Sequence, residues 1–564
     1  MMTAAQTFVQ VLLPVKLRWI PTYSSPAPLE AGTRVCVALG RRRYDGVVWR
    51  SLERPNLPPE RIQPILGVQD ALPRVTPEDL RFWEFLSDYY LCTPGEVYKA
   101  AYPISKLRSE KLASKLEARA TQSIERQRLA LETKIPMLES RLAAKEAALS
   151  RKHRQDITER LQEERDRIAG QLELLRRDLA ELTVAPSPKA FQEAIDFGEK
   201  PILLRGTDRA PYYLDEIRRT LASGRDVLIL EPETDFGFNL RDMLGRPLKE
   251  SLLFCGATTS PREKREVLAA VRDASRPVAV IGVRSSVFLP WRKLGLVIVD
   301  EEQDSSLKQN ETAPLYNGRD VAAMLARIHG ARLILGSACP SLESLSNCLS
   351  GKYELVTVSE ILPAVEIIDI PAERHKRGMV GNYSRKALEE IAALPDDALV
   401  TIVRCYQTED AALAELREVL PGRDPQLLSA PAARKSGCHS DLTLVLQADA
   451  LFDRTDFRAD EKALQMLSSI RNHTDRLIVQ CGAASHPVYR ALAGNRAAQD
   501  AAIAELLFER KKYKLPPYTR LVDMRDKVSI VRREVLQRDS SLAERKKELK
   551  LQYGALYTFD VDPL

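Results

Sequence analysis

Long apolar runs are missing from this 564-residue sequence, and so are cysteine pairs with the spacing of a metal site. No stretch approaches the ~20 apolar residues of a membrane-spanning helix, and no basic region followed by an apolar core opens the chain. We therefore expect a cytoplasmic protein. The cysteines form no CxxC pair, which indicates neither a disulfide framework nor a zinc site. They are Cys36, Cys92, Cys255, Cys339, Cys348, Cys405, Cys438 and Cys481.

The sequence also has little net charge. It carries 84 basic against 78 acidic residues, a formal charge of +6. That balance permits binding to nucleic acid but does not argue for it. Hydrophobic content of 44% with 29% charged residues is typical of a folded, soluble protein. The length is too great for one core and predicts three or more domains.

Three carboxylates follow the clearest buried strand. Residues 294–299 are apolar and rich in β-branched side chains, which predicts a strand covered on both faces of a parallel sheet. Asp300, Glu301 and Glu302 come next, at the edge where open α/β sheets place their chemistry. Such acids suit a Mg²⁺-nucleotide site, where one holds the metal and one orients water. The alternative is a polar loop after a core strand.

The first hundred residues predict strands and then helix. Residues 7–66 read as β structure, with a basic turn at Arg41, Arg42 and Arg43. The turn is either a solvated loop or a phosphate contact. Residues 76–103 have helical spacing, and their aromatic stripe is expected in the core.

Residues 106–185 predict a helical arm. Leu161, Ile168, Leu175 and Leu182 stand seven residues apart, as in a coiled coil. Two helices broken near Pro136 would form an antiparallel hairpin, or one helix would pair with another chain.

Several ordered stretches carry a family resemblance. LLPVKL, EAGTRVCVALGRRRYDGVV and QPILGVQD lie near the N-terminus. IGVRSSVFLPWRKLGLVIVDEEQDSSLKQ, GSACPSLESL, LQADALFDRTDFRADEKALQML and ERKKYKLPPYTRL follow in order. The chain thereby resembles the primosomal protein N′ family, the PriA replication-restart helicases. This implies an α/β fold: a two-lobe RecA-like core of parallel sheets, of the helicase superfamily 2 type. A small β DNA-binding domain and the coiled-coil insertion precede that core.

The resemblance also implies DNA contacts. In the family, the N-terminal domain holds the 3′ end of a nascent strand, and Tyr23 and Gly32 match residues of that pocket. Pro21, Thr22 and Gln63 depart from it. We further expect DNA contacts at Arg41, Arg42, Arg43, Arg284 and Lys308.

The nucleotide site departs most from the family. Its phosphate-binding loop is reduced here to Gly206-Thr207-Asp208-Arg209-Ala210-Pro211, without Gly-Lys-Thr, so Gly206 and Thr207 are a remnant. Arg209 could replace the lysine but cannot restore the backbone cradle. Asp300 and Glu301 are then a relict metal and water motif, followed by Glu302 and by Gln303, which replaces a coupling histidine.

The second half of the core lacks further family elements. The arginine motif is reduced to a stretch containing Arg471, and the zinc-binding insertion is missing. We expect no metal, and ATP with Mg²⁺ only if residual activity remains.

These patterns predict a domain order and a function. The predicted parts are a β domain (1–68), a partial winged-helix-like segment (69–105), the arm (106–185), helicase lobe 1 (186–358), a reduced lobe 2 (359–521) and a shortened C-terminal segment (522–564). The leading hypothesis is a DNA-binding protein of replication restart with impaired or absent ATP hydrolysis. Its partners would be forked or 3′-ended DNA and primosome proteins. The alternatives are an active 3′–5′ DNA helicase, and a coiled-coil scaffold that does not bind DNA.

Overall fold

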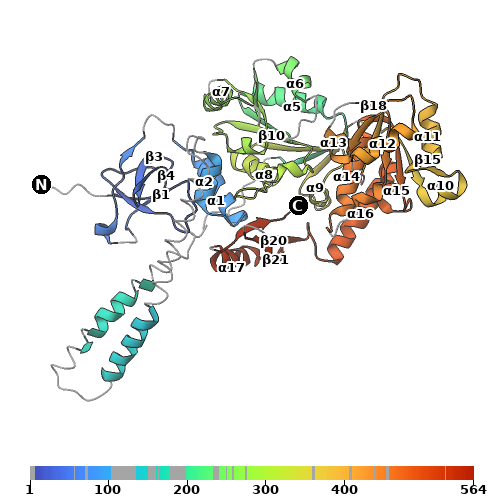
Figure 1. The fold of residues 1–564 in the computed structure, drawn as a ribbon. Helices are drawn as coiled ribbons and strands as arrows, with labels where there is room; N and C mark the ends of the chain where they lie inside the picture. Colours follow the sequence, from blue (N-terminus) through green and yellow to red (C-terminus); the bar gives the residue numbers. More distant parts are fainter. Residues whose placement is uncertain are drawn as a thin grey trace.

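In the described part of the chain, the strands form four sheets of three or more strands, and helices cover the two large ones (Figure 1). The computed structural model describes residues 7–55, 58–69, 74–102, 135–149, 161–162, 164–173, 175–176, 199–232, 240–248, 251–256, 259–273, 276–358, 362–405, 409–435, 439–452, 456–526, 529–554 and 556–563. In Figure 1 the N-terminal sheet lies at one end, two helix-covered sheets follow, and the C-terminal strands lie beneath the first of these.

The N-terminal sheet is antiparallel, with the order β2-β1-β4-β3-β5. Its strands are β1 (Thr7–Leu12), β2 (Thr22–Ser25), β3 (Arg34–Leu39), β4 (Arg42–Leu52) and β5 (Gly67–Val68). Two helices follow, α1 (Pro77–Tyr89) and α2 (Pro94–Ala101). Each begins with a threonine capping box and a proline in the first turn, which fixes its starting point. Leu91, with φ +55°, separates the two helices.

The first large sheet is parallel throughout, with the order β12-β6-β11-β10-β7-β9-β8. Its strands are β6 (Ile202–Arg205), β7 (Asp226–Leu230), β8 (Leu252–Cys255), β9 (Ala279–Gly282), β10 (Leu294–Asp300), β11 (Arg332–Ser337) and β12 (Glu354–Thr357). Its helices are α5 (Ala210–Ala222), α6 (Leu240–Leu248), α7 (Pro261–Arg272), α8 (Gly318–His329) and α9 (Leu342–Leu349), with short 3₁₀ turns at Arg284–Phe288 and Ser305–Leu307. The predicted central strand is β10, and only its last residue leaves the buried core.

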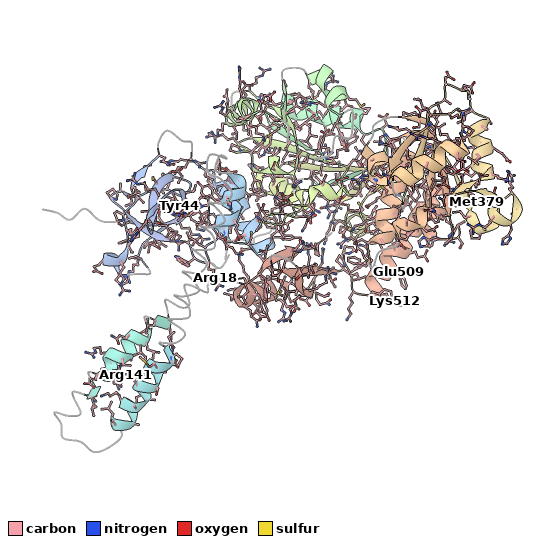
Figure 2. The ribbon with its side chains drawn as sticks, in the orientation of Figure 1. Arg18, Tyr44, Arg141, Met379, Glu509 and Lys512 are labelled. Carbon is pink, nitrogen blue, oxygen red and sulfur yellow. The ribbon has the colours of Figure 1, made fainter. Side chains whose placement is uncertain are left out.

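The second large sheet is also parallel, with the order β13-β19-β18-β16-β17. Its strands are β13 (Ala364–Asp369), β16 (Val400–Arg404), β17 (Gln426–Ser429), β18 (Ser440–Leu446) and β19 (Thr474–Cys481). Its helices are α10 (Ile370–Lys376), α11 (Arg385–Ala392), α12 (Glu409–Val419), α13 (Ala430–Lys435), α14 (Ala459–Arg471), α15 (Pro487–Ala493) and α16 (Arg496–Lys512). A 3₁₀ turn (Ala448–Leu451) and a small ladder of β14 (Met379–Val380) with β15 (Tyr383–Ser384) complete this part. The side-chain view labels Glu509 and Lys512 near the end of α16 and Met379 at the outer edge of this part (Figure 2).

The chain ends in an antiparallel sheet of order β21-β20-β22. Its elements are β20 (Thr519–Arg525), β21 (Ile530–Gln537), α17 (Leu542–Tyr553) and β22 (Thr558–Val561). The boundary predicted between residues 521 and 522 falls within β20. Together the two parallel sheets and the N-terminal β sheet confirm the predicted α/β class with a small β domain before it.

Parts of the predicted arm are described, as helical residues 135–149 and 164–173. Leu138 packs with Ile168 and Leu172. Ion pairs join Lys145 to Glu164 (2.5 Å) and Arg176 to Glu139 (2.6 Å), so the two stretches run antiparallel. The first stretch begins at Ile135, next to Pro136, so the break predicted near Pro136 does not fall between the two stretches. The coiled coil remains a prediction, and most of its residues lie outside the described part.

Candidate functional site

The expected carboxylates lie at the carboxyl edge of the first parallel sheet. Strand β10 is central, between β11 and β7, and Asp300 pairs in register with Gly336 of β11. Glu301 leaves the strand with φ +48°, an uncommon conformation for a residue with a side chain. The sheet therefore delivers Asp300 and Glu301 to the edge that the sequence predicts.

Arg209 binds both carboxylates. Its Nε donates to Oδ1 of Asp300 at 2.8 Å, and its Nη2 donates to Oε1 of Glu301 at 2.5 Å. Its remaining fork nitrogen, Nη1, donates to the carbonyl oxygen of Gly206 at 2.6 Å. Arg209 is 7% exposed, so this ion-pair group is largely removed from solvent. A guanidinium of the chain itself thus lies between the two carboxylates.

Electrostatics at this group favour the bound arginine. Burial opposes the charge of Arg209, but Asp300 and Glu301 outweigh it and hold the pKa of the guanidinium well above its usual range. Burial raises the pKa of Asp300 in spite of Arg209. Burial also opposes ionisation of Glu301, but Arg209 and a hydrogen bond from Gln303 lower its pKa overall. Glu301 is therefore the more strongly ionised partner.

The remnant phosphate loop is closed by its own contacts. The backbone N–H of Gly206 donates to the carbonyl oxygen of Ser337 at 3.1 Å, and the φ of Gly206 is +137°. The hydroxyl of Tyr213 donates to Oδ1 of Asp300 at 2.7 Å. It lies so close to Gly336 that a Cβ built there would meet it at 1.6 Å. Oδ1 of Asp300, Oε1 of Glu301 and the N–H of Gly206 are therefore engaged by groups of the chain itself.

Tyr213 is a residue that the sequence reasoning missed. It follows Arg209 by four residues, so both side chains leave the start of α5 on one face. That spacing was visible in the sequence. The contact with Asp300, far away along the chain, was not.

Glu302 and Gln303 have internal partners. Glu302 is buried and accepts hydrogen bonds from the Ser341 backbone (2.6 Å), from the hydroxyls of Ser341 and Ser344 (both 2.9 Å) and from Arg319 (3.2 Å). Gln303 donates through Nε2 to Glu301 at 2.6 Å. Glu302 therefore anchors the start of α9 to the end of β10.

The reduced arginine motif is buried as well. The Nε of Arg471 donates to the carbonyl oxygen of Pro363 at 2.7 Å, and its Nη1 donates to that of Leu492 at 2.9 Å. Its guanidinium thus holds backbone within the second sheet and is not directed to the carboxylates of the first.

The expected residues of the N-terminal pocket have structural roles. Tyr23 is 3% exposed, and its hydroxyl donates to the carbonyl oxygen of Ala38 at 2.9 Å. Gly32 has φ +86°, and a Cβ there would meet the carbonyl oxygen of Val75 at 2.0 Å. The basic turn is different: Arg41, between β3 and β4, and Arg43, at the start of β4, are exposed, and Arg42 is half-buried. Among the residues expected to contact DNA in the N-terminal domain, only those of the basic turn expose charged side chains to solvent.

Two further DNA contacts were expected in the first large sheet, and Lys308 contradicts the expectation. Its ammonium is fully buried, pairs with Asp560 at 2.8 Å, and donates to the carbonyl oxygens of Leu315 (2.9 Å) and Val561 (2.8 Å). A phosphate cannot reach it, so Lys308 holds the C-terminal sheet to the first parallel sheet. Arg284 is half-buried and donates to the carbonyl oxygen of Ser306 at 2.8 Å.

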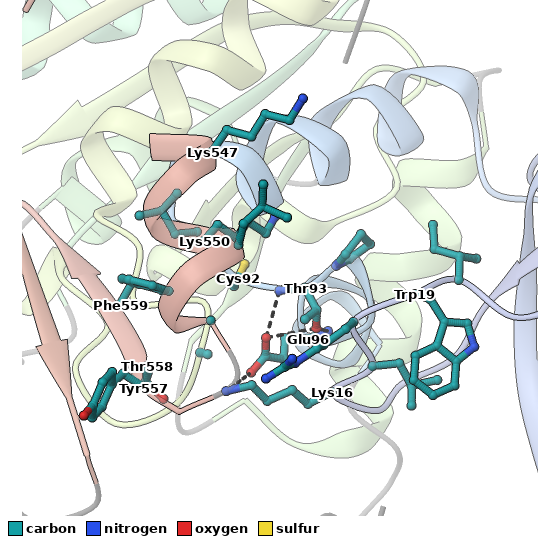
Figure 3. Close-up of a pocket in the computed structure, with 18 residues that line it drawn as sticks. Lys16, Trp19, Cys92, Thr93, Glu96, Lys547, Lys550, Tyr557, Thr558 and Phe559 are labelled. Carbon is teal, nitrogen blue, oxygen red and sulfur yellow. Dashed lines mark hydrogen bonds and ion pairs between the residues drawn. The ribbon is translucent and has the colours of Figure 1, made fainter. Parts of the chain in front are cut away.

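A small pocket lies where the N-terminal and C-terminal parts meet (Figure 3). Its volume is about 60 Å³, and its wall includes Trp19, Cys92 and Phe559. Lys16 pairs with Glu96 at 3.8 Å, and Glu96 accepts from the Thr93 backbone at 2.8 Å. Lys547 points away from this pair in Figure 3. The pocket is far below the ~300 Å³ of ordinary ligand sites, so we regard it as a packing gap.

The described residues show neither a metal-binding cluster nor a membrane-spanning helix. No cluster of three or more histidine, cysteine, aspartate or glutamate side chains in the described ranges is placed to hold a metal ion. Across the same residues, no helix has the length and apolar character to cross a membrane.

Comparison with known proteins identifies similar sequences. Residues 10–103 match the family model of the PriA 3′ DNA-binding domain. The replication restart protein PriA of Chlamydia pneumoniae is 28% identical over 441 residues, which are 68% of this chain and 56% of that protein. PriA of Rickettsia conorii is 26% identical over 68% of this chain and 50% of its own length. PriA of Rickettsia prowazekii is 34% identical over 31% of this chain and 28% of its own length. The chain thus spans about half the length of the curated relatives that it matches most fully.

Solved structures are more distantly similar. RecG bound to a three-way DNA junction has a TM-score of 0.37 and 13% identity, over 56% of this chain and 47% of that one. The DUF1998 helicase MrfA bound to DNA and AMPPNP has a TM-score of 0.33 and 13% identity, over 56% and 48%.

Proposed function

Because this chain belongs to the family of the replication restart protein PriA, we propose that it binds DNA in replication restart without hydrolysing ATP. The proposed absence of ATP hydrolysis rests on the ion-pair group of Arg209 with Asp300 and Glu301. In phosphoryl transfer, a metal ion bridges the β- and γ-phosphates and neutralises their charge. Here an arginine of the chain itself already binds the two carboxylates.

Displacing Arg209 would be costly. The guanidinium makes three hydrogen bonds in a site largely closed to water, and a buried charge without partners is strongly unfavourable. A nucleotide would also need backbone N–H groups, but that of Gly206 is engaged by Ser337. Arg471, the residue of the reduced arginine motif, does not compensate in this proposal, because it is bound to backbone carbonyls. Each of these features would weaken stabilisation of the transition state for ATP hydrolysis, and their effects combine.

DNA binding is supported by the family match and by the exposed basic turn. Residues 10–103 match the 3′ DNA-binding domain, and Arg41 and Arg43 lie exposed within that range. Tyr23 and Gly32 support the sheet that carries the turn. In the proposal, Arg41 and Arg43 contact phosphates and position the DNA without reading its sequence.

Two measurements test the proposal. ATP hydrolysis by the full chain should stay at background with or without single-stranded DNA, and DNA-stimulated turnover would overturn the catalytic part. Anisotropy should show binding to forked DNA that weakens in Arg41→Gln/Arg43→Gln. The double variant should also reduce the salt slope by about 2, one per lost phosphate contact. Arg417→Gln, an exposed arginine on α12, is the matched control. Fork affinity unchanged by the double variant would exclude the turn as the DNA contact.

A further inference from the structure

A large cavity lies where four parts of the chain meet. Its volume is about 580 Å³. Helix α1 contributes Phe85 and Tyr89, the first parallel sheet contributes Glu302, and the second contributes side chains of α14. Arg520 of β20 and Arg538, just after β21, belong to its C-terminal wall. Nothing described above assigns this cavity a ligand.

Acidic groups at the cavity already have partners. Asp562 pairs with Arg520, and its Oδ1 also accepts from the backbone of Leu521 at 3.2 Å. Asp320 pairs with Arg319 at 2.9 Å, and Asp304 pairs with Arg434 at 2.7 Å. Glu343 lies 3.6 Å from Arg458. Close by, Asp88 lies 3.7 Å from Lys550. Each of these carboxylates is therefore already paired with a cation of the chain.

Lys546 and Arg538 pair with no carboxylate in the described part of the chain. Lys546 lies 4.3 Å from the centre of the Tyr89 ring, and Arg520 lies 4.9 Å from it. Within the described part of the chain, neither Lys546 nor Arg538 makes an ion pair or a side-chain hydrogen bond. Burial, and then the charge of Arg520, lowers the pKa of Lys546 to about 7 and also lowers that of Arg538. Arg520 and Arg538 both line the cavity and are here called the Tyr89 cation group, and Asp562 is the carboxylate paired with Arg520.

We propose that this cavity binds a phosphate group at the Tyr89 cation group. A phosphate group is anionic at neutral pH, and the two guanidinium groups outnumber the one paired carboxylate. Guanidinium groups suit phosphate because their planar fork donates two parallel hydrogen bonds. An anion there would also relieve the repulsion between Arg520 and Arg538. The phosphate belongs either to a free ligand or to a nucleic-acid backbone, and both sources present the same oxygen acceptors.

Calorimetric titration of the full chain with inorganic phosphate, at constant ionic strength, tests the site. Wild type should bind saturably, and Arg538→Gln should bind about tenfold more weakly, the effect of losing one charge-assisted hydrogen bond. Arg538 has no partner to lose, so this variant should keep the wild-type melting temperature. Arg262→Gln, on exposed α7, is the control and should bind phosphate as wild type does.

The source of the phosphate is separated by competition. Adenosine monophosphate and a single-stranded oligonucleotide without terminal phosphates are each tested for displacement of inorganic phosphate. Displacement by the oligonucleotide identifies a backbone phosphate, and displacement by the monophosphate alone identifies a free ligand. The proposal is overturned if wild type shows only the response that chloride gives at equal ionic strength. Equal phosphate binding by wild type and Arg538→Gln would overturn it too. Neither phosphate-binding result depends on ATP hydrolysis or on the basic turn. The phosphate site can therefore be refuted without refuting the proposed function, and the reverse also holds.

Discussion

At the scale of single residues, Arg209 determines what the carboxylate edge can do. Replacing it by methionine leaves Asp300 and Glu301 close together without a counter-charge. Removing one partner of a buried pair typically costs about 3–5 kcal/mol, and the low end applies here because both carboxylates keep some exposure. We expect Arg209→Met to melt at a lower temperature than wild type. We further expect Mg²⁺ to restore part of the loss, because the freed carboxylates are suitable ligands.

The same variant should change the pH dependence of stability. Without Arg209, repulsion between the two carboxylates and their burial raise both pKa values above those of the unfolded chain. The folded form then binds more protons, so the stability of the variant should fall as pH rises above about 4. Thermal melts from pH 5 to 8, with and without Mg²⁺, measure both effects. Arg219→Met, an exposed position on the same helix, is the control. A variant that melts like wild type and ignores Mg²⁺ would contradict the assigned role of Arg209.

At the scale of elements, helix α14 joins the two parallel sheets through Glu461. One carboxylate oxygen accepts from the backbone of Leu342 in α9 at 2.9 Å, and the other pairs with buried Arg510 of α16. Glu461→Ala leaves that N–H and guanidinium without their main partner, at a cost of roughly 3–5 kcal/mol. Hydrogen exchange should accelerate in α9, α14 and α16 but not in the N-terminal sheet. Glu505→Ala, exposed on α16, should leave all rates unchanged. Uniform acceleration throughout the chain would show global rather than joint-specific destabilisation.

Elements could be predicted from the sequence where their cause is local. The buried strand ending at Asp300 follows from an apolar β-branched run, and the starts of α1 and α2 follow from Thr-Pro capping signals. The pairing of Arg209 with Asp300 could not be predicted, because 91 residues separate them and only the sheet order brings them together. Lys308 fails for a related reason: its partner Asp560 comes from the far end of the chain. In the sequence, such charged residues looked like surface residues, because their buried partners lie far away along the chain.

At the scale of the whole molecule, ionic contacts fix the two parallel sheets in one arrangement. Asp304 and Arg434 pair across them at 2.7 Å, and Arg205 and Asp500 pair at 2.6 Å. The chain end adds a third tie, because Arg458 donates to the carbonyl oxygen of Pro563 at 2.9 Å. These contacts connect parts that would have to separate if a nucleotide cycle moved them. A rigid platform is therefore the expected state.

Small-angle scattering can measure that rigidity. A ligand shifts a conformational equilibrium only through different affinity for its two states. Since the carboxylate edge is closed by Arg209 and Tyr213, Mg²⁺-nucleotide should leave the radius of gyration unchanged. The double variant Asp304→Asn/Asp500→Asn should instead expand the molecule, because the pairs that hold the two sheets together lose their charge. Contraction of the wild-type chain on adding nucleotide would show that the sheets still move relative to each other, and that the contacts of Arg209 open when nucleotide binds.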